Sequence, residues 1–76
     1  MNREFKWACR TLLEMNNVPA TPGYMKAFEN PDANERWIKA MVKGGNPQIG
    51  SMTSSTYDKV INILEANGIN VNPYTP

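Results

Sequence analysis

The sequence predicts a small all-α domain of four to five helices, followed by an extended C-terminal tail. Apolar residues recur three and four positions apart in several segments, whereas no segment shows the strict alternation expected of paired strands. Glycine, proline and N-cap residue types separate these segments. The chain has 76 residues, 41% of them hydrophobic, and this length allows one domain with a thin core. We therefore assign residues 1–69 to a single helical domain and residues 70–76 to the tail.

The first helix is expected from Arg3 to Asn16. Its apolar face follows i, i+3, i+4, i+7 spacing and comprises Phe5, Ala8, Cys9, Leu12, Met15 and Asn16. At about 100° per residue, the opposite face comprises Arg3, Lys6, Trp7, Arg10 and Glu14. The helix should therefore bury one side and expose a mainly basic side that includes a tryptophan.

A second, shorter helix is expected from Pro22 to Glu29. Thr21 is a favourable N-cap residue, and proline suits the first helical position because it lacks an N–H that would be unpaired there. The residues expected to turn inward are Tyr24, Met25 and Phe28. Pro31 then ends the segment, since a proline disfavours the helical conformation of the residue before it.

The third helix should begin within residues 31–34 and end at Lys43. One face carries Ala33, Trp37 and Met41, with Ile38 beside them. The other face carries Asp32, Arg36, Lys39 and Lys43, with Glu35 close to it. Gly44 is a typical C′ residue, and a lysine in the last turn suits the negative end of the helix dipole.

The fourth helix has the clearest signals. The connector GGNPQIGSMT leads to an N-cap at Thr53 or Ser54. The expected buried stripe comprises Tyr57, Val60, Ile61 and Leu64. Gly68 should close the helix, and Ile69 occupies the position at which a Schellman motif makes its hydrophobic contact.

The composition limits the chemistry that the chain can perform. It contains one cysteine, Cys9, and no histidine, which argues against Cys/His zinc sites, Cys–His nucleophiles and histidine acid–base catalysis. The acidic residues are scattered, and no base is placed to activate the hydroxyl groups of GSMTSST. We therefore expect a protein that is not an enzyme and that uses no cofactor and no metal.

The sequence also bears on location. No apolar run approaches the roughly 20 residues of a membrane span. Charged residues interrupt the N-terminal segment where a signal peptide would need an apolar region. We expect a cytoplasmic protein that does not contact a membrane.

A basic stripe is the most informative surface feature. Arg36, Lys39 and Lys43 recur at i, i+3 and i+7, so they should line one ridge of the third helix. Such a ridge could neutralise phosphates or read base edges in a major groove. The alternative is a solvated face in which Asp32 and Glu35 each pair with the cation four residues later. The formal net charge is only +1, so any anion-binding surface must arise from local clustering.

The residues after the basic stripe form a family-like pattern. A glycine ends the helix, a loop with a proline follows, and the next helix reads T-x-x-K-(apolar)-x-x-x-L-x-x-x-G-(apolar). The positions are Gly44, Pro47, Thr56, Lys59, Val60, Leu64, Gly68 and Ile69. This arrangement, over about Thr21 to Ile69, resembles the lambda-repressor/Cro-like helix-turn-helix family. The resemblance implies a helix-turn-helix-like core with Pro22–Glu29 as its first helix and Asn34–Lys43 as its recognition helix.

The resemblance also implies roles for individual residues. The exposed N-terminal part of a recognition helix reaches base edges, and here it carries Asn34, Glu35, Arg36 and Lys39. Arginine and lysine favour guanine, whereas asparagine favours adenine. Phosphate contacts would come from Lys43, Gly45, Asn46, Ser54 and Ser55, in a glycine-rich loop and at a helix N-terminus. The expected function is transcriptional control through double-stranded DNA, as a homodimer of the kind of regulator that phages and plasmids encode.

A second class of function stays open, namely a small regulator that binds a host protein, such as transcription machinery, without contacting DNA. Trp7 is expected among Arg3, Lys6 and Arg10, and an exposed tryptophan beside arginine is common at interface hot spots. Tyr74 in the tail is a second candidate anchor for a partner. The alternatives are that Trp7 packs under the tail beside a tyrosine, and that the tail is a frayed terminus.

Overall fold

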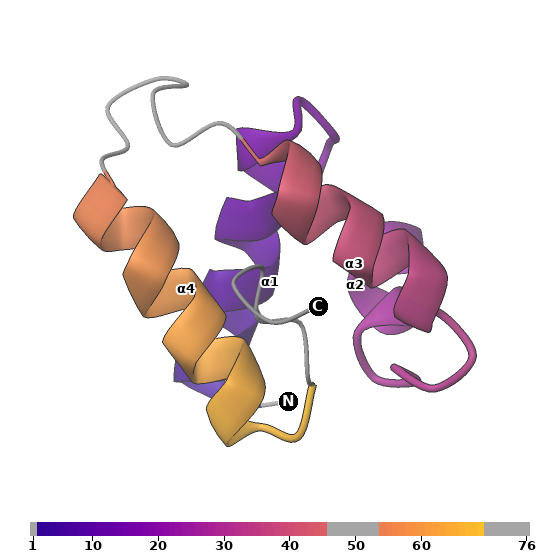
Figure 1. The fold of residues 1–76 in the computed structure, drawn as a ribbon. Helices are drawn as coiled ribbons and strands as arrows, with labels where there is room; N and C mark the ends of the chain where they lie inside the picture. Colours follow the sequence, from indigo (N-terminus) through magenta and orange to yellow (C-terminus); the bar gives the residue numbers. More distant parts are fainter. Residues whose placement is uncertain (1, 46–53, 70–76) are drawn as a thin grey trace.

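The described part of the chain, residues 2–45 and 54–69 of a computed structural model, contains four α-helices and no strand (Figure 1). The helices are α1 (Arg3–Met15), α2 (Pro22–Ala27), α3 (Glu35–Gly44) and α4 (Ser54–Ala66). The predicted all-α class is confirmed, and the four predicted helices are present with ends shifted by one or two residues. The predicted tail, residues 70–76, lies outside the described residues.

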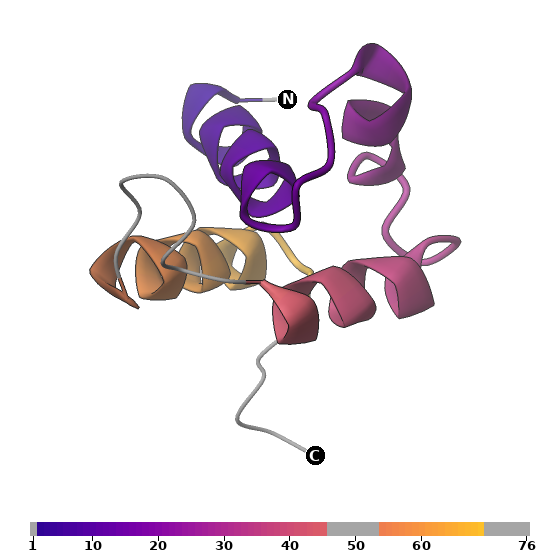
Figure 2. The same ribbon diagram turned by 90° about the horizontal axis from the view of Figure 1, so that it is seen from above.

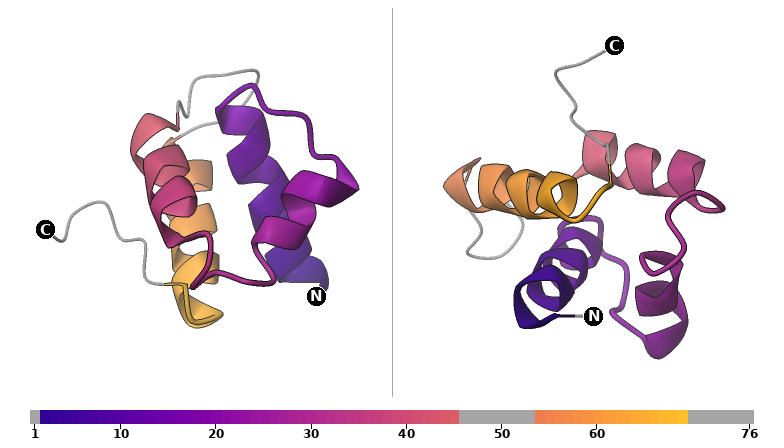
Figure 3. Two further views of the ribbon diagram at one scale, coloured as in Figure 1. Left: turned by 90° about the vertical axis from the view of Figure 1, so that its right-hand side faces the viewer. Right: turned by 90° about the horizontal axis from the view of Figure 1, so that it is seen from below.

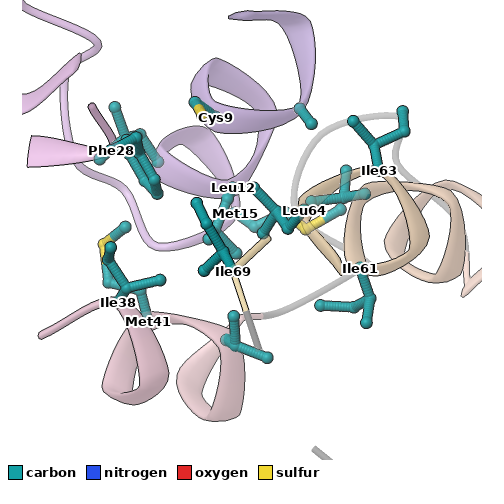
Figure 4. Packing of buried hydrophobic residues seen from close by; sticks show 14 residues of the cluster. Cys9, Leu12, Met15, Phe28, Ile38, Met41, Ile61, Ile63, Leu64 and Ile69 are labelled. Atoms are coloured by element: carbon teal, nitrogen blue, oxygen red, sulfur yellow. The ribbon is translucent and has the colours of Figure 1, made fainter. Parts of the chain in front are cut away.

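The helices form two layers. Seen from above, α3 and α4 lie along one side of the molecule and α1 and α2 along the other (Figures 2 and 3). α1 packs against each of the other helices, and most extensively against α4. Between the layers lies a core that includes Ala8, Cys9, Leu12, Leu13, Met15, Phe28, Ile38, Met41, Val42, Val60, Ile61, Ile63, Leu64 and Ile69 (Figure 4). With α1 against the core side of α3, the other side of α3 is left to solvent.

Side-chain caps begin the first two helices. The Asn2 side-chain oxygen accepts a hydrogen bond from the backbone N–H of Phe5 at 2.7 Å. The Thr21 hydroxyl accepts one from the backbone N–H of Tyr24 at 3.4 Å, and Pro22 follows it in the first turn, as predicted. Each cap satisfies one of the N–H groups that a helix start leaves unpaired.

The end of α4 is the predicted Schellman motif. The backbone N–H of Ile69 donates to the carbonyl of Leu64, and that of Gly68 donates to the carbonyl of Glu65, both at 3.0 Å. Gly68 has φ +86°, a left-handed conformation that glycine adopts without steric cost. Ile69 is buried, so the motif turns the chain back onto the core.

Replacing Gly68 with alanine should lower the free energy of unfolding by about 1–2 kcal/mol, because the left-handed conformation is costly for a residue with a Cβ. A Cβ at this position would meet no atom within 4 Å, so backbone conformation alone sets the cost. Gly23→Ala, inside α2 and at negative φ, should be neutral or stabilising by up to about 1 kcal/mol. Urea unfolding followed by circular dichroism compares the two variants. Equal destabilisation by both would contradict this explanation.

The C-terminal end of α3 differs from its prediction. Gly44 is the last helical residue, not a C′ residue, and Gly45 follows in an extended conformation with φ −61° and ψ 131°. A Cβ on Gly45 would lie 3.3 Å from the Met41 carbonyl oxygen and 3.3 Å from a ring carbon of Tyr57. The absence of a side chain at Gly45 therefore allows the chain that leaves α3 to pass close to the Tyr57 ring of α4.

Two side chains hold this end of α3 in place. The side-chain amide of Asn16 donates to the carbonyl of Met41 at 3.0 Å and to the carbonyl of Leu12 at 2.9 Å. The Tyr57 hydroxyl donates to the carbonyl of Val42 at 2.6 Å. Side chains from α4 and from the end of α1 thus donate hydrogen bonds to carbonyl groups in the last turn of α3, which have no partner within the helix. They fix the rotation of α3 about its own axis, and hence the direction in which its outer face points.

Candidate nucleic-acid interface

α3 has one buried face and one open face. Ile38, Met41 and Val42 are buried against the core. The opposite face, which we call the outer ridge of α3, consists of Arg36, Lys39, Ala40 and Lys43, and all four are exposed. The structure thus brings the three predicted cations together on one exposed ridge.

The charges on the outer ridge are only partly compensated. Lys39 donates to the Glu35 carboxylate at 2.7 Å, and this hydrogen bond and charge hold the pKa of Glu35 below its ordinary value. This is the one ion pair between side chains within residues 2–45 and 54–69. Of the two ion pairs in the alternative interpretation of this face, the pair of Glu35 with Lys39 is present and the pair of Asp32 with Arg36 does not form within that part of the chain. Arg36 and Lys43 therefore form no ion pair with a carboxylate in that part of the chain.

The ion pair itself is loosely held. The Lys39 and Glu35 side chains are 47% and 63% exposed, and pairs this open to water contribute little and are screened by salt. Lys39 could therefore exchange the Glu35 carboxylate for a phosphate with little loss of free energy. A hollow of about 400 Å³ lies beside the pair, lined by Asp32, Ala33, Glu35, Arg36 and Lys39. The first turn of α3 thus offers hydrogen-bond donors and acceptors side by side.

Other residues predicted to contact DNA lie away from the outer ridge. Asn34 is half-buried, and its side-chain amide donates to the carbonyl of Asn30 at 2.9 Å within the turn. Ser55 is exposed but lines a separate hollow with Glu4 and Asp58, between α1 and α4. Gly45 is half-buried at the junction of α3 and α4. Asn46, Tyr74 and the side chain of Ser54 lie outside what the structure describes.

The basic side of α1 is exposed except at its tryptophan. Arg3, Lys6 and Arg10 face solvent as expected. Trp7 is half-buried and packs against the core, with the ammonium of Lys59 lying 5.0 Å from its ring centroid. The prediction of an exposed Trp7 was wrong because α4 covers this edge of α1; Tyr24 stacks on Trp37 instead of Trp7, and Tyr74 lies outside the described residues. A cation over an indole is itself a favourable contact.

An aromatic row joins α2 to α3, and the sequence did not indicate it. The Tyr24 ring stacks on Trp37 with centroids 5.9 Å apart and an interplanar angle of 15°. Phe28 lies on Trp37 at 5.8 Å with its ring tilted by 53°. Phe28 is buried as predicted, but Tyr24 is 43% exposed, so its predicted inward orientation was wrong. The row leads from the core to the surface beside the N-terminal half of α3.

The remaining side chains define no other reactive centre. The pKa of the Cys9 thiol is raised to about 12 by burial, which keeps the thiol protonated and inert. No group of three metal-ligating His, Cys, Asp or Glu side chains occurs among the described residues. No helix in that part of the chain is long and apolar enough to cross a bilayer.

No protein-family model, curated protein sequence or solved structure matches this chain. Residues 2–45 and 54–69 form a domain with four helices that presents a cationic ridge on α3 and an aromatic row beside that ridge.

Proposed function

We propose that this domain is a small DNA-binding regulator of transcription that lays the outer ridge of α3 in the major groove of a duplex. The observation that carries the proposal is the exposure of Arg36 and Lys43, without a carboxylate partner in the described residues, on a helix whose other face is buried. The resemblance to lambda-repressor/Cro-like proteins assigns the same helix to recognition.

The dimensions of α3 suit this role. Arg36 and Lys43 are seven residues apart, which corresponds to about 10 Å along a helix. A major groove is about 12 Å wide and accepts a helix of 10–12 Å diameter. Ala40 lies between the two cations and adds little bulk, so the helix backbone could approach the base edges closely.

The connection between α2 and α3 departs from the usual motif. Seven residues, 28–34, separate the two helices, whereas a helix-turn-helix usually has a turn of about 3–4 residues. The aromatic contacts of Tyr24 and Phe28 with Trp37 still pack α2 against α3. The proposal therefore depends on the outer ridge of α3 and not on the turn.

The charge of the domain limits its affinity. Even if all three ridge cations neutralised a phosphate, the salt slope would be only about −2.7 for one domain. A net charge of +1 adds little long-range attraction. We therefore expect two copies of the chain to bind two half-sites, as small DNA readers commonly do.

The test compares Arg36→Ala, Lys43→Ala and, as a control, Lys26→Ala, an exposed lysine of α2. Lys43→Ala should weaken binding to all sequences and reduce the salt slope by about 0.9, since one phosphate contact is lost. Arg36→Ala should relax the preference at one base pair and cost about 1–3 kcal/mol. Lys26→Ala should change neither quantity by much. Fluorescence anisotropy with selected and random duplexes measures both, and absence of duplex binding at low salt would refute the proposal.

The alternative function, binding of a host protein without DNA, rested mainly on an exposed Trp7. Trp7 is half-buried and Lys59 lies over its ring, so it offers a partner less surface than an exposed tryptophan would. Arg3, Lys6 and Arg10 remain available on α1. A partner whose capture is abolished by Trp7→Ala while the fold is kept would favour this alternative.

A further inference from the structure

Tyr24 is the one exposed large hydrophobic side chain among the described residues. Its ring is stacked nearly parallel on Trp37, and Trp37 in turn contacts the buried Phe28. Trp37 lies against one side of the Tyr24 ring, while 43% of the residue stays open to water. The surface thus carries an exposed aromatic ring that is stacked on a second ring without any ligand.

The fold gives no evident reason for this exposure. α2 is six residues long and contains no buried residue, so Tyr24 does not anchor it in the core. The Tyr24 hydroxyl makes no hydrogen bond in the described part of the chain. A polar residue at this position would leave less apolar surface in water. Packing against Trp37 accounts for the covered side of the ring, whereas the exposed side fits a binding surface.

The ring is continuous with the outer ridge of α3. Trp37 directly follows Arg36, and at about 100° per residue the order around the helix is Lys43, Arg36, Ala40, Trp37. Only the small side chain of Ala40 lies between the cations and the tryptophan on which Tyr24 stacks. A ligand that carries phosphates beside flat rings could therefore contact Arg36 and Tyr24 together.

We propose that the Tyr24–Trp37 pair is a stacking platform for an unpaired nucleobase of the bound DNA. This inference rests on the proposed function, because it places the platform beside the duplex held by α3. Bases within a duplex stack on each other and cannot reach an aromatic ring, whereas a base at a single-stranded extension can. Aromatic rings next to cations bind such bases with little sequence preference. The chain should therefore prefer a duplex that continues into a single strand over a blunt duplex of the same sequence.

The experiment measures affinity for a blunt duplex and for the same duplex with an oligo-dT extension of either polarity. Wild-type protein should bind one extended duplex roughly tenfold more tightly, the typical effect of one stacked base. Tyr24→Ala should remove this gain and leave blunt-duplex affinity unchanged, whereas Tyr24→Phe should keep the gain because it keeps the ring. Tyr24→Phe should unfold like the wild type. Tyr24→Ala loses the stacking on Trp37, so it should unfold at a somewhat lower urea concentration and still be folded under the conditions of the binding assay.

Two outcomes would contradict the proposed platform. One is equal affinity of the wild type for blunt and extended duplexes, and the other is an affinity gain for the extended duplex that persists in Tyr24→Ala. Both leave duplex binding by α3 intact, so they are distinguishable from failure of the proposed function, in which blunt duplex does not bind. A separate readout uses Trp7→Phe protein, in which Trp37 is the remaining tryptophan. Stacking on Tyr24 should change Trp37 fluorescence when oligo-dT is added, and an unchanged spectrum at saturating oligo-dT counts against the platform.

Discussion

Replacing Phe28 with alanine should lower the free energy of unfolding by about 3–5 kcal/mol, the usual cost of removing a buried phenylalanine. A domain of this size has a total stability of roughly 4–11 kcal/mol. The substitution should therefore remove much of the stability and leave a substantial unfolded population at 37 °C. Phe28 is 1% exposed and is among the largest fully buried side chains.

Phe28 has this effect because it is the main anchor of a weakly held segment. α2 itself buries no residue, so the segment from α2 through residues 28–34 depends on the side chain that directly follows the helix. The ring contacts Trp37 of α3. It also belongs to the same hydrophobic core cluster as the buried residues of α1 (Figure 4). A cavity at Phe28 would loosen the packing of α2 on α3, and the surrounding helices could not close it without moving.

Two measurements separate loss of this anchor from a general effect. Phe28→Leu fills most of the space and should cost less than about 1.5 kcal/mol in urea unfolding. The Cys9 thiol is buried with its pKa raised to about 12, so thiol reagents should label it only when the domain opens. Labelling should be about a hundredfold to a few thousandfold faster in Phe28→Ala, because each loss of about 1.4 kcal/mol raises the open population tenfold. A loss below about 1 kcal/mol in Phe28→Ala, with unchanged labelling, would contradict the assignment.

The features that the sequence predicted correctly are local. Helical periodicity placed Leu12 and Leu64 in the core, and both are fully buried. Thr21 and Gly68 marked a helix start and a helix end because capping depends on neighbours a few residues away. The exposure of Arg36 and Lys43 followed from the same periodicity, so the cationic ridge could be predicted without knowledge of the tertiary fold.

The features that the sequence missed depend on how helices meet. Trp7 lies at the edge of the apolar face of α1, where burial is decided by the approach of α4 and its Lys59. Tyr24 lies at the edge of a short helix, and its orientation follows from the position of Trp37 on α3. The two adjacent glycines at the end of α3 could not by themselves indicate that Gly45 lies against Tyr57. Helix-wheel reasoning assigns faces, but the angle between two helices decides which edge residues are covered.

The largest functional effect is expected from Ala40→Glu, a single change in the middle of the outer ridge of α3. The new carboxylate would lie one turn from Arg36 and one turn from Lys43, close enough to pair with both. Such pairs stabilise a helix by about 0.2–0.5 kcal/mol each, which offsets the lower helix propensity of glutamate. Unfolding free energy should therefore change by less than about 0.5 kcal/mol. Duplex affinity should fall on the order of a hundredfold, because the base contact of Arg36 and the phosphate contact of Lys43 are both weakened, with the salt slope reduced by about 0.9 for the phosphate contact.

Matched variants show which property of Ala40→Glu acts on DNA. Ala40→Gln adds nearly the same bulk without charge, so it should weaken binding far less if neutralisation of the ridge is the cause. Asn62→Glu makes the same change of net charge at an exposed position of α4 and should leave affinity nearly unchanged. Equal losses from glutamate at positions 40 and 62 would mean that overall charge, and not the ridge, determines binding. Equal losses from Ala40→Gln and Ala40→Glu would instead show that close approach of the α3 backbone is the controlling feature.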